Sequence, residues 1–231
     1  MGSESCSEGR WQGVTDRPLR VFPRRRPRAW RLLPVLLLVA AEALGGQPAA
    51  GVILVLGDSL SSAYGIDVDD GWVQLLQNRI DARGADYRVV NASISGDTTN
   101  GGAARLPAAL RKHAPEVVVV ELGGNDGLLG LPLGVTRANL ERIIVESKNA
   151  GAQVLLLGMR LPPNYGPAYT EAFFAIYEDL AERHDVARVP FFLEGVGGVD
   201  GMMQNDGIHP VAAAQPVMLE NVWPHLEPLL R

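Results

Sequence analysis

The sequence is poor in cysteine and carries no excess of positive charge. Cys6 is the one cysteine among 231 residues, which excludes an internal disulfide framework and a cysteine-based zinc cluster. A formal net charge of -5 argues against a general nucleic-acid-binding protein, and no nucleic-acid partner is expected. With 47% hydrophobic and 20% charged residues, the composition is that of a globular protein rather than a disordered one. The length suits one well-buried core.

Long apolar runs are also scarce, and the main candidate lies near the N-terminus. Residues 32–41 (LLPVLLLVAA) follow a basic segment at 24–28, but they fall short of the ~20 residues that a membrane-spanning helix needs. Small residues follow at 41–43 (AEA), so the pattern predicts a signal peptide that is cleaved near residues 43–50. A retained anchor and a disordered basic tail are the alternatives for 1–50.

The distribution of charged residues also distinguishes the N-terminal segment from the rest of the chain. Residues 1–50 hold eight arginines and four acidic residues, whereas 51–231 hold thirteen basic and twenty-two acidic residues. We therefore expect 51–231 to be the functional domain, exported to the periplasm or secreted, with no stable membrane span after cleavage.

Short apolar runs alternate with amphipathic ones from residue 51 onward. The run at 117–122 (VVVVEL) is typical of a buried strand, and 70–82 carries apolar residues at helical spacing. Near-continuous apolar strands separated by helices indicate a parallel sheet covered on both faces, and hence a three-layer α/β/α domain. In such sheets, ligands bind at the carboxyl ends of the strands. The predicted strands cover 52–56, 87–90, 117–122, 154–157 and 187–189, and the predicted helices cover 70–82, 102–113, 138–150, 167–184 and 211–230.

Polar groups suited to acyl transfer stand at the ends of these elements. Ser59 follows the first strand, and a serine hydroxyl needs an adjacent base to attack a carbonyl. His209 can act as that base if a carboxylate holds its other nitrogen, and Asp206 lies three positions earlier. Developing negative charge on the carbonyl oxygen needs fixed hydrogen-bond donors. We predict that the backbone N–H groups of Ser59 and Gly96 and the side-chain amide of Asn125 form this oxyanion hole.

Four short blocks, in this order, resemble those of the SGNH (GDSL-type) hydrolase family. They are 57–61 (GDSLS), Gly96, 123–126 (GGND) and 206–209 (DGIH), and the similarity extends over nearly all of 52–229. It is greatest to the bacterial periplasmic branch of multifunctional thioesterases, lysophospholipases and arylesterases. The resemblance implies a flavodoxin-like sheet of about five parallel strands in the order 2-1-3-4-5. It also implies the triad and oxyanion donors given above, and neither a metal nor an organic cofactor.

Apolar residues in the loops after the third and fourth strands are candidates for substrate binding. Leu128, Pro162 and Tyr165 are predicted to line a groove for the acyl chain, as the family resemblance suggests. The alternative is that several of these residues simply cover the core. The expected partner is a small-molecule acyl ester or thioester, lipids included, and the expected oligomeric state is a monomer.

Other polar features favour ordinary structural roles. Residues 67–71 (DVDDG) have the acidic spacing of a calcium loop, but a glycine occupies the third ligand position, which favours a solvated turn. His113, His184 and His225 lie within or at the end of predicted helices, away from the strand ends, and we expect no chemistry from them.

These residues together predict a serine esterase that hydrolyses carboxylic ester or thioester bonds through an acyl-enzyme. Two alternatives stay open. One is a carbohydrate-directed acetylesterase of the same superfamily, and the other is a non-catalytic exported binding protein. The intact set of Ser59, Asp206 and His209 counts against the binding protein.

Overall fold

The computed structural model of this protein describes residues 50–230. The predicted signal peptide lies outside these residues. Within them, no helix is both long and apolar enough to cross a membrane.

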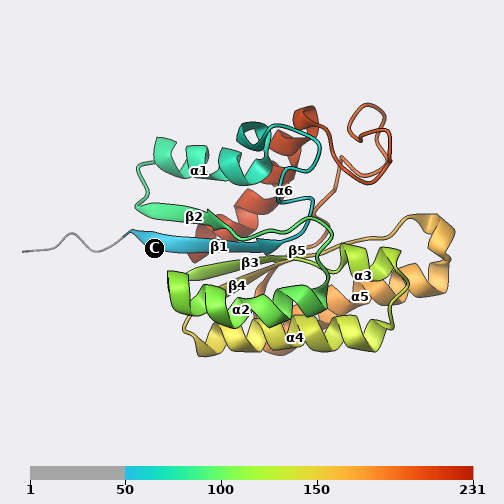
Figure 1. Ribbon diagram of the computed structural model, residues 1–231, viewed down its shortest axis with the longest axis horizontal. Coiled ribbons are helices and arrows are strands. Elements are labelled where there is room, and N and C mark those ends of the chain that lie inside the picture. The colour runs from blue at the N-terminus through green and yellow to red at the C-terminus, as the bar shows by residue number, and fades with distance from the viewer. Residues whose placement is uncertain (1–49, 231) are drawn as a thin grey trace, which may run out of the picture. The chain divides into compact units, whose positions relative to one another are not determined.

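One parallel sheet forms the centre of the domain (Figure 1). Its strands are β1 (Gly51–Gly57), β2 (Tyr87–Asn91), β3 (Val117–Glu121), β4 (Gln153–Leu157) and β5 (Ala187–Val189). They are hydrogen-bonded in the order β2-β1-β3-β4-β5, and every pair is parallel. The predicted fold class and strand order are therefore confirmed. The central strand β3 is buried along its whole length, as its unbroken valine run requires.

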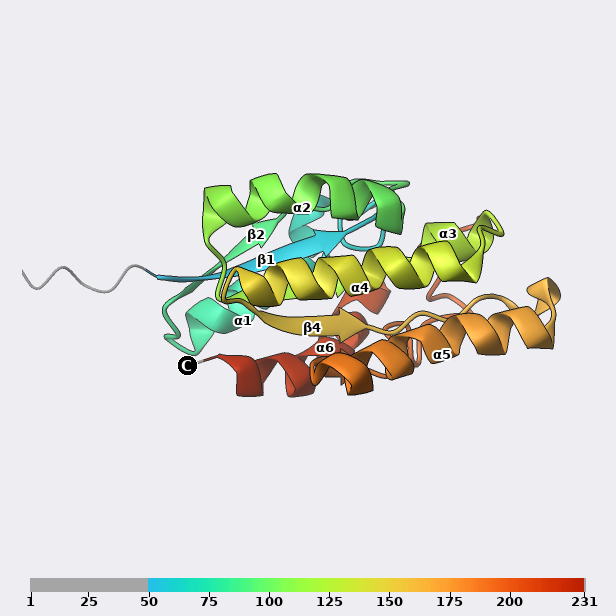
Figure 2. The same ribbon diagram turned by 90° about the horizontal axis from the view of Figure 1, so that it is seen from below.

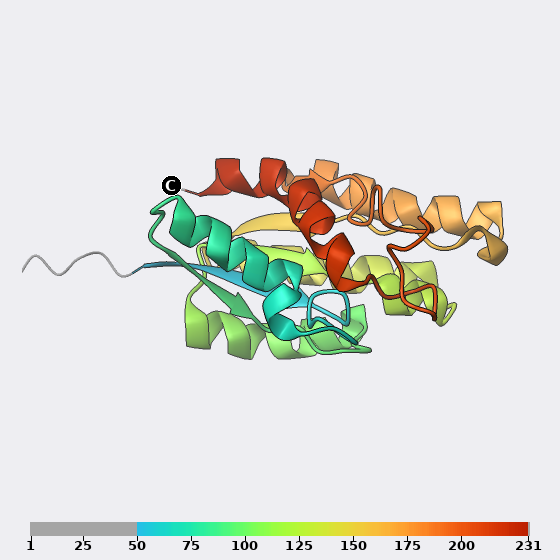
Figure 3. The ribbon, with the colours of Figure 1, turned by 90° about the horizontal axis from the view of Figure 1, so that it is seen from above.

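Helices cover both faces of the sheet (Figure 1). α1 (Trp72–Ala82) and α6 (Gln215–Leu226) lie side by side on one face, as Figure 3 shows. α2 (Thr99–His113), α4 (Leu133–Asn149) and α5 (Pro167–His184) cover the other face, which Figure 2 presents. Five shorter elements complete the described part of the chain: helix α3 (Gly124–Leu128) and the 3-10 turns η1 (Val68–Asp70), η2 (Pro163–Tyr165), η3 (Ala212–Ala214) and η4 (Glu227–Leu229).

Apolar stripes hold the helices against the sheet. In α1, the side chains of Trp72, Leu76 and Ile80 are fully buried, at the spacing of one helical face. Leu140 and Ile143 of α4 are fully buried on the opposite side of the sheet. Burying such a side chain stabilises the fold by about 1.5–3 kcal/mol relative to leaving it in water.

Besides α1 and α2, which begin at Trp72 and Thr99 rather than at 70 and 102, three helical regions differ from the sequence prediction. α3 was not predicted, because its five residues are too few for a helical period to show. α4 begins at Leu133 rather than 138, directly after Pro132, and its first turn contains a glycine that weakens the helical pattern. The helix predicted over 211–230 is divided into η3, α6 and η4. Pro216 and Pro228 each stand at the start of one of these segments, where the missing N–H is tolerated.

A fully buried carboxyl group lies at the carboxyl end of β3. Glu121 Oε2 accepts hydrogen bonds from the backbone N–H of Asp58 (3.1 Å) and from the hydroxyl of Ser61 (2.8 Å). Glu121 Oε1 has no hydrogen-bond partner among the described residues. Burial, reinforced by the nearby carboxylate of Asp58, raises the pKa of Glu121 well above its ordinary value. Burial therefore favours the protonated, uncharged form of Glu121. A Cβ atom at Gly57 would lie 2.7 Å from Glu121 Oε2, so only glycine fits beside this carboxyl group.

The packing of α4 predicts the effect of one core truncation. Leu140→Ala removes a fully buried side chain, and we expect the free energy of unfolding to fall by about 2–5 kcal/mol because a cavity remains. Val145→Ala, on the exposed side of the same helix, is the control and should cost less than about 1 kcal/mol. Urea unfolding measures both values. Equal losses in the two variants would contradict this account of α4.

The buried carboxyl group predicts a pH dependence of stability. Above the ordinary pKa of 4.5, the unfolded chain releases the Glu121 proton while the folded chain keeps it, so the free energy of unfolding falls as pH rises. Glu121→Gln keeps an acceptor oxygen but cannot ionise. We expect its stability relative to the parent to improve by up to about 1.4 kcal/mol per pH unit above pH 4.5. Urea unfolding from pH 5 to 8 tests this, and parallel curves for the two proteins would contradict it.

Candidate active site

Ser59 stands on a tight turn that follows β1. The Asp58 side chain shapes this turn, because its Oδ1 accepts a hydrogen bond from the Leu60 N–H at 3.1 Å. The Asp58 carbonyl accepts another from the Ser62 N–H at 3.0 Å. Ser59 itself is buried to all but 8% of its surface, and its backbone N–H donates to no group within 50–230. The turn therefore leaves the N–H of Ser59 available for a ligand.

The structure brings Ser59, His209 and Asp206 together. His209 Nε2 lies 3.0 Å from Ser59 Oγ, although the two residues are 150 positions apart in the sequence. His209 Nδ1 lies 2.6 Å from Asp206 Oδ2. With the proton on Nδ1, the imidazole donates to Asp206 and accepts from the Ser59 hydroxyl. This is the arrangement that a serine nucleophile and its base require.

Asp206 is held in its ionised form by its neighbours. The hydrogen bond from the His209 ring lowers the pKa of Asp206 to about 2, and the backbone N–H groups of His209 and Ile208 contribute to the shift. Both N–H groups donate to Asp206 Oδ1, at 3.0 and 2.9 Å. The three-residue spacing seen in the sequence thus closes a local loop around one carboxylate, which stays negative at neutral pH.

Gly96 lies in the loop that follows β2. Its φ of +78° is a left-handed conformation that favours glycine. Its N–H, like that of Ser59, donates to no group within residues 50–230. Arg105 of α2 holds this loop against the end of β1. Its Nε donates to Asp97 Oδ2 at 2.7 Å and its Nη2 donates to the Gly57 carbonyl at 3.0 Å. A third contact joins Nη1 to the carbonyl of Ala92.

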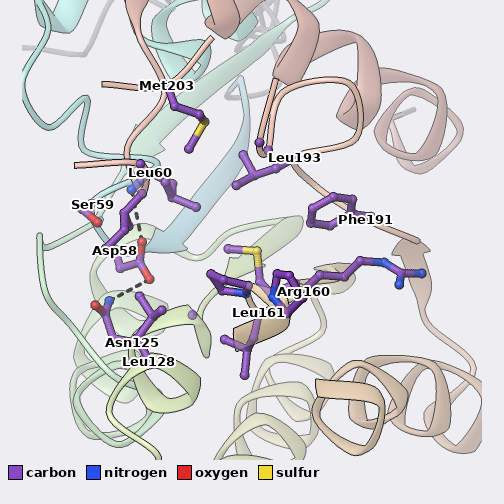
Figure 4. A pocket seen from close by; sticks show the side chains of 18 residues that line it. Asp58, Ser59, Leu60, Asn125, Leu128, Arg160, Leu161, Phe191, Leu193 and Met203 are labelled. Atoms are coloured by element: carbon purple, nitrogen blue, oxygen red, sulfur yellow. Dashed lines mark hydrogen bonds between the residues drawn. The ribbon is translucent and has the colours of Figure 1, made fainter. Parts of the chain in front are cut away.

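Asn125 lies shortly after the end of β3, in the first turn of α3. Its Nδ2 donates to Asp58 Oδ2 at 3.0 Å, as Figure 4 shows, and to the Asp97 carbonyl at 2.8 Å. Both amide protons are therefore engaged, and an oxyanion would have to replace one of these acceptors. Burial raises the pKa of Asp58 to about 6. The Asp58 carboxyl group thus links the turn that carries Ser59 to the amide of Asn125.

An apolar pocket of about 380 Å³ opens beside Ser59. Figure 4 shows Ser59 and Asn125 on one side of it and Phe191 and Arg160 on the other. Its volume lies within the range of small-molecule sites. The side chains that line it between these two sides are mostly apolar, among them Leu60, Leu128, Met159, Leu161, Pro162, Leu193, Met203 and Ile208.

The pocket includes two of the three predicted substrate-binding residues. Leu128 and Pro162 line it. Tyr165 is not among the lining residues, and its hydroxyl instead donates to the Leu128 carbonyl at 3.0 Å. Sequence reasoning missed Met159 and Phe191, yet the strand-end rule points to both, since they follow β4 and β5 closely.

The remaining titratable candidates lie elsewhere. His184 ends α5, where its Nε2 lies 2.9 Å from Glu141 Oε1, while His113 ends α2 and His225 lies in α6. Asp67 accepts a hydrogen bond from the Asp69 N–H at 3.1 Å, which forms the turn at 67–71. Within residues 50–230, no three or more His, Cys, Asp or Glu side chains are grouped closely enough to hold a metal ion.

Comparison with known proteins relates this geometry to a family. The sequence profile of the GDSL-like Lipase/Acylhydrolase family matches residues 55–215. The chain is 58% identical to the esterase TesA of Pseudomonas aeruginosa over 192 residues, which cover 83% of this chain and 96% of that protein. It is 46% identical to thioesterase 1/protease 1/lysophospholipase L1 of Escherichia coli over 198 residues, covering 86% and 93% of the two chains.

Solved structures agree with the sequence comparison. A crystal structure of TesA superposes with a TM-score of 0.76 at 60% identity and covers 78% of this chain and 99% of that one. The psychrotrophic esterase EstA from Pseudoalteromonas, in a structure inhibited by monoethylphosphonate, gives a TM-score of 0.73 at 38% identity, with coverage of 77% and 97%. The fold, the four blocks and these similarities lead to one assignment. The chain belongs to the GDSL-like lipase/acylhydrolase family, the SGNH hydrolases, in the branch that contains TesA and E. coli thioesterase 1, and it is an ester hydrolase.

Proposed function

We propose that Ser59, His209 and Asp206 form a catalytic triad that hydrolyses oxygen esters and thioesters of acyl chains through an acyl-enzyme. One observation carries the proposal. A buried serine hydroxyl lies 3.0 Å from a histidine nitrogen whose partner nitrogen lies 2.6 Å from a carboxylate. Such a relay serves a nucleophile that needs its proton removed as it attacks.

The first step forms a bond between Ser59 Oγ and the carbonyl carbon of the substrate. As it forms, the Ser59 proton moves to His209 Nε2, and the carbonyl π electrons move onto the oxygen. Asp206 stays ionised and stabilises the imidazolium, as the low pKa of its carboxyl group allows.

The negative oxygen of this intermediate needs donors that are already in place. The N–H groups of Ser59 and Gly96 have no other acceptor within residues 50–230, and we assign them to the oxyanion. The amide of Asn125 is the third donor. It turns one proton from Asp58 or from the Asp97 carbonyl to the oxyanion.

Collapse of the intermediate breaks the bond to the alcohol or thiol, which leaves with the proton from His209. A water molecule then attacks the acyl-serine and gives its proton to His209. A second collapse releases the carboxylic acid and returns the proton to Ser59 Oγ. Each of the two half-reactions uses the same base and the same oxyanion donors.

The pocket supports an acyl chain as the group that is held. Its lining is mainly aliphatic and aromatic, and Leu128 and Pro162 both contribute to it. The names of the relatives, which include esterase, thioesterase and lysophospholipase, describe proteins that act on substrates of the same chemical class. We therefore include thioesters and lysolipids among the substrates of this chain. Export by the segment before residue 51 belongs to the same proposal and is supported by the basic and apolar pattern at 24–43.

The first prediction under this proposal concerns Ser59 and chain length. Ser59→Ala should lower kcat on p-nitrophenyl esters by about 10⁴-fold or more, because no other group replaces the nucleophile. In the parent, turnover across a series from acetate to palmitate should peak at medium or long acyl chains, because the pocket is apolar. A sharp optimum at acetate would favour the acetylesterase alternative instead. Near-parental turnover by a folded Ser59→Ala protein would overturn the proposal.

The second prediction concerns the oxyanion donors. Asn125→Ala should lower kcat by about 10²–10³-fold with little change in KM, because the lost hydrogen bond forms with the transition state. Asn78→Ala is the control, since that side chain only accepts a hydrogen bond on the exposed surface of α1. If kcat of the Asn125→Ala protein matched that of the control in steady-state assays, Asn125 would have no part in the oxyanion hole.

A further inference from the structure

The loop that carries His209 is closed at its base by backbone hydrogen bonds. Gln204 N–H donates to the His209 carbonyl at 2.7 Å, and Val211 N–H donates to the Met202 carbonyl at 2.9 Å. Gly207 N–H donates to the Gln204 carbonyl at 2.9 Å, which tightens the turn before His209. The loop is therefore an ordered unit, although it has only an isolated strand bridge and no helix.

The Gln204 side chain ties this unit to the turn that carries Ser59. Its Nε2 donates to the Pro210 carbonyl at 3.0 Å and to the Tyr64 carbonyl at 2.8 Å, so both amide protons are used. Tyr64 N–H in turn donates to the Ser59 carbonyl at 3.2 Å. The Gln204 amide thus connects Pro210, the residue after His209, with Tyr64, whose N–H is hydrogen-bonded to Ser59.

The chain backbone leaves space for this amide. Gly65 has a φ of +76°, and a Cβ atom there would lie 2.3 Å from Gln204 Oε1. The same segment places the Tyr64 ring against His209, with ring centroids 4.5 Å apart. The Gln204 contact therefore lies where the segment after Ser59 meets the loop that carries His209.

The two hydrogen bonds of the His209 ring, to Asp206 and to Ser59, differ in which parts of the chain they hold together. The contact between Asp206 and His209 is local, because the two residues are three positions apart, and it moves with the loop. The contact between His209 and Ser59 joins distant segments and depends on a single 3.0 Å hydrogen bond. A displacement of about 1 Å in such a site can cost about 100-fold in rate. The Gln204 hydrogen bond to Tyr64 and the Tyr64–His209 ring contact are further ties across this junction.

We infer that Gln204 is a positioning residue, which holds the His209 loop against the Ser59 turn and so maintains the distance between base and nucleophile. The inference rests on the proposed triad. Gln204 lies outside the pocket lining, so its effect should fall on proton transfer at Ser59 rather than on substrate binding.

Gln204→Met tests the inference in the full chain, because methionine has a similar length and no amide. Two readings are taken: kcat and KM on a p-nitrophenyl ester, and the rate at which a fluorophosphonate labels Ser59. We expect kcat and the labelling rate to fall together, by about tenfold to a hundredfold, while KM stays near the parent value. The labelling rate reports the activation of Ser59 without an acyl chain in the pocket.

Two controls separate positioning from general stability. Gln74→Met makes the same substitution on α1, where the amide only bonds to Asn78, and should leave kcat unchanged. Ile143→Val loosens the core on α4 and should lower the melting temperature without lowering kcat. Gln204→Glu is a second variant, which keeps Oε1 beside Gly65 but loses both donors, and its kcat should also fall.

The outcomes distinguish this inference from the function on which it rests. A kcat and a labelling rate equal to those of the parent in either folded Gln204 variant would overturn the positioning role. A loss of kcat/KM that comes entirely from a rise in KM would also overturn it. In both cases an inactive Ser59→Ala protein in the same assay would leave the triad intact. Turnover that survives Ser59→Ala would instead remove the proposed function itself.

Discussion

The parallel pairing of β1 with both β2 and β3 is the constraint on which the site depends. It sets Val55 opposite Asn91 and Gly57 opposite Glu121, so that three strands end at one edge. The turns that follow carry Ser59, Gly96 and Asn125, which lie 37 and 29 positions apart in the sequence. Because β1 and β3 are buried on both faces, their register cannot slip without exposing apolar side chains. The sheet thereby fixes the spacing of groups that no local structure could hold.

A buried polar network connects this sheet to the site. The Trp72 indole N–H donates to Ser61 Oγ at 3.2 Å, and the Ser61 hydroxyl donates to Glu121 Oε2. Glu121 also accepts from the N–H of Asp58, whose carboxylate accepts from the amide of Asn125. In a low-dielectric interior such bonds are strong, and a broken one is costly. The Ser59 turn and the oxyanion amide are thus anchored to the core, which suits a site whose donors must be in place before charge develops.

The pattern of continuous apolar strands and intervening helices predicts the parallel sheet and the three-layer class, whereas the strand order came from the resemblance to the SGNH family. Sequence reasoning placed Ser59, His209 and Asp206 as one group, and the structure does bring them together. It did not reveal α3, which is shorter than the period that would show it. It could not reveal the roles of Glu121 or Gln204 either. The pattern at 117–122 predicts a buried strand but not the partners of the Glu121 carboxyl group. The partners of Gln204 are the backbone carbonyl of Tyr64, 140 positions away, and that of Pro210, and no spacing pattern encodes them.

A crystal structure of the protein labelled with a fluorophosphonate tests the central claim most directly. Phosphonylation mimics the tetrahedral intermediate, so the account predicts phosphorus bonded to Ser59 Oγ and a phosphonyl oxygen that accepts hydrogen bonds from Ser59 N, Gly96 N and Asn125 Nδ2. Asn125 should have released Asp58 or the Asp97 carbonyl to make this bond. A phosphonyl oxygen directed into solvent, or an adduct on a residue other than Ser59, would contradict the account.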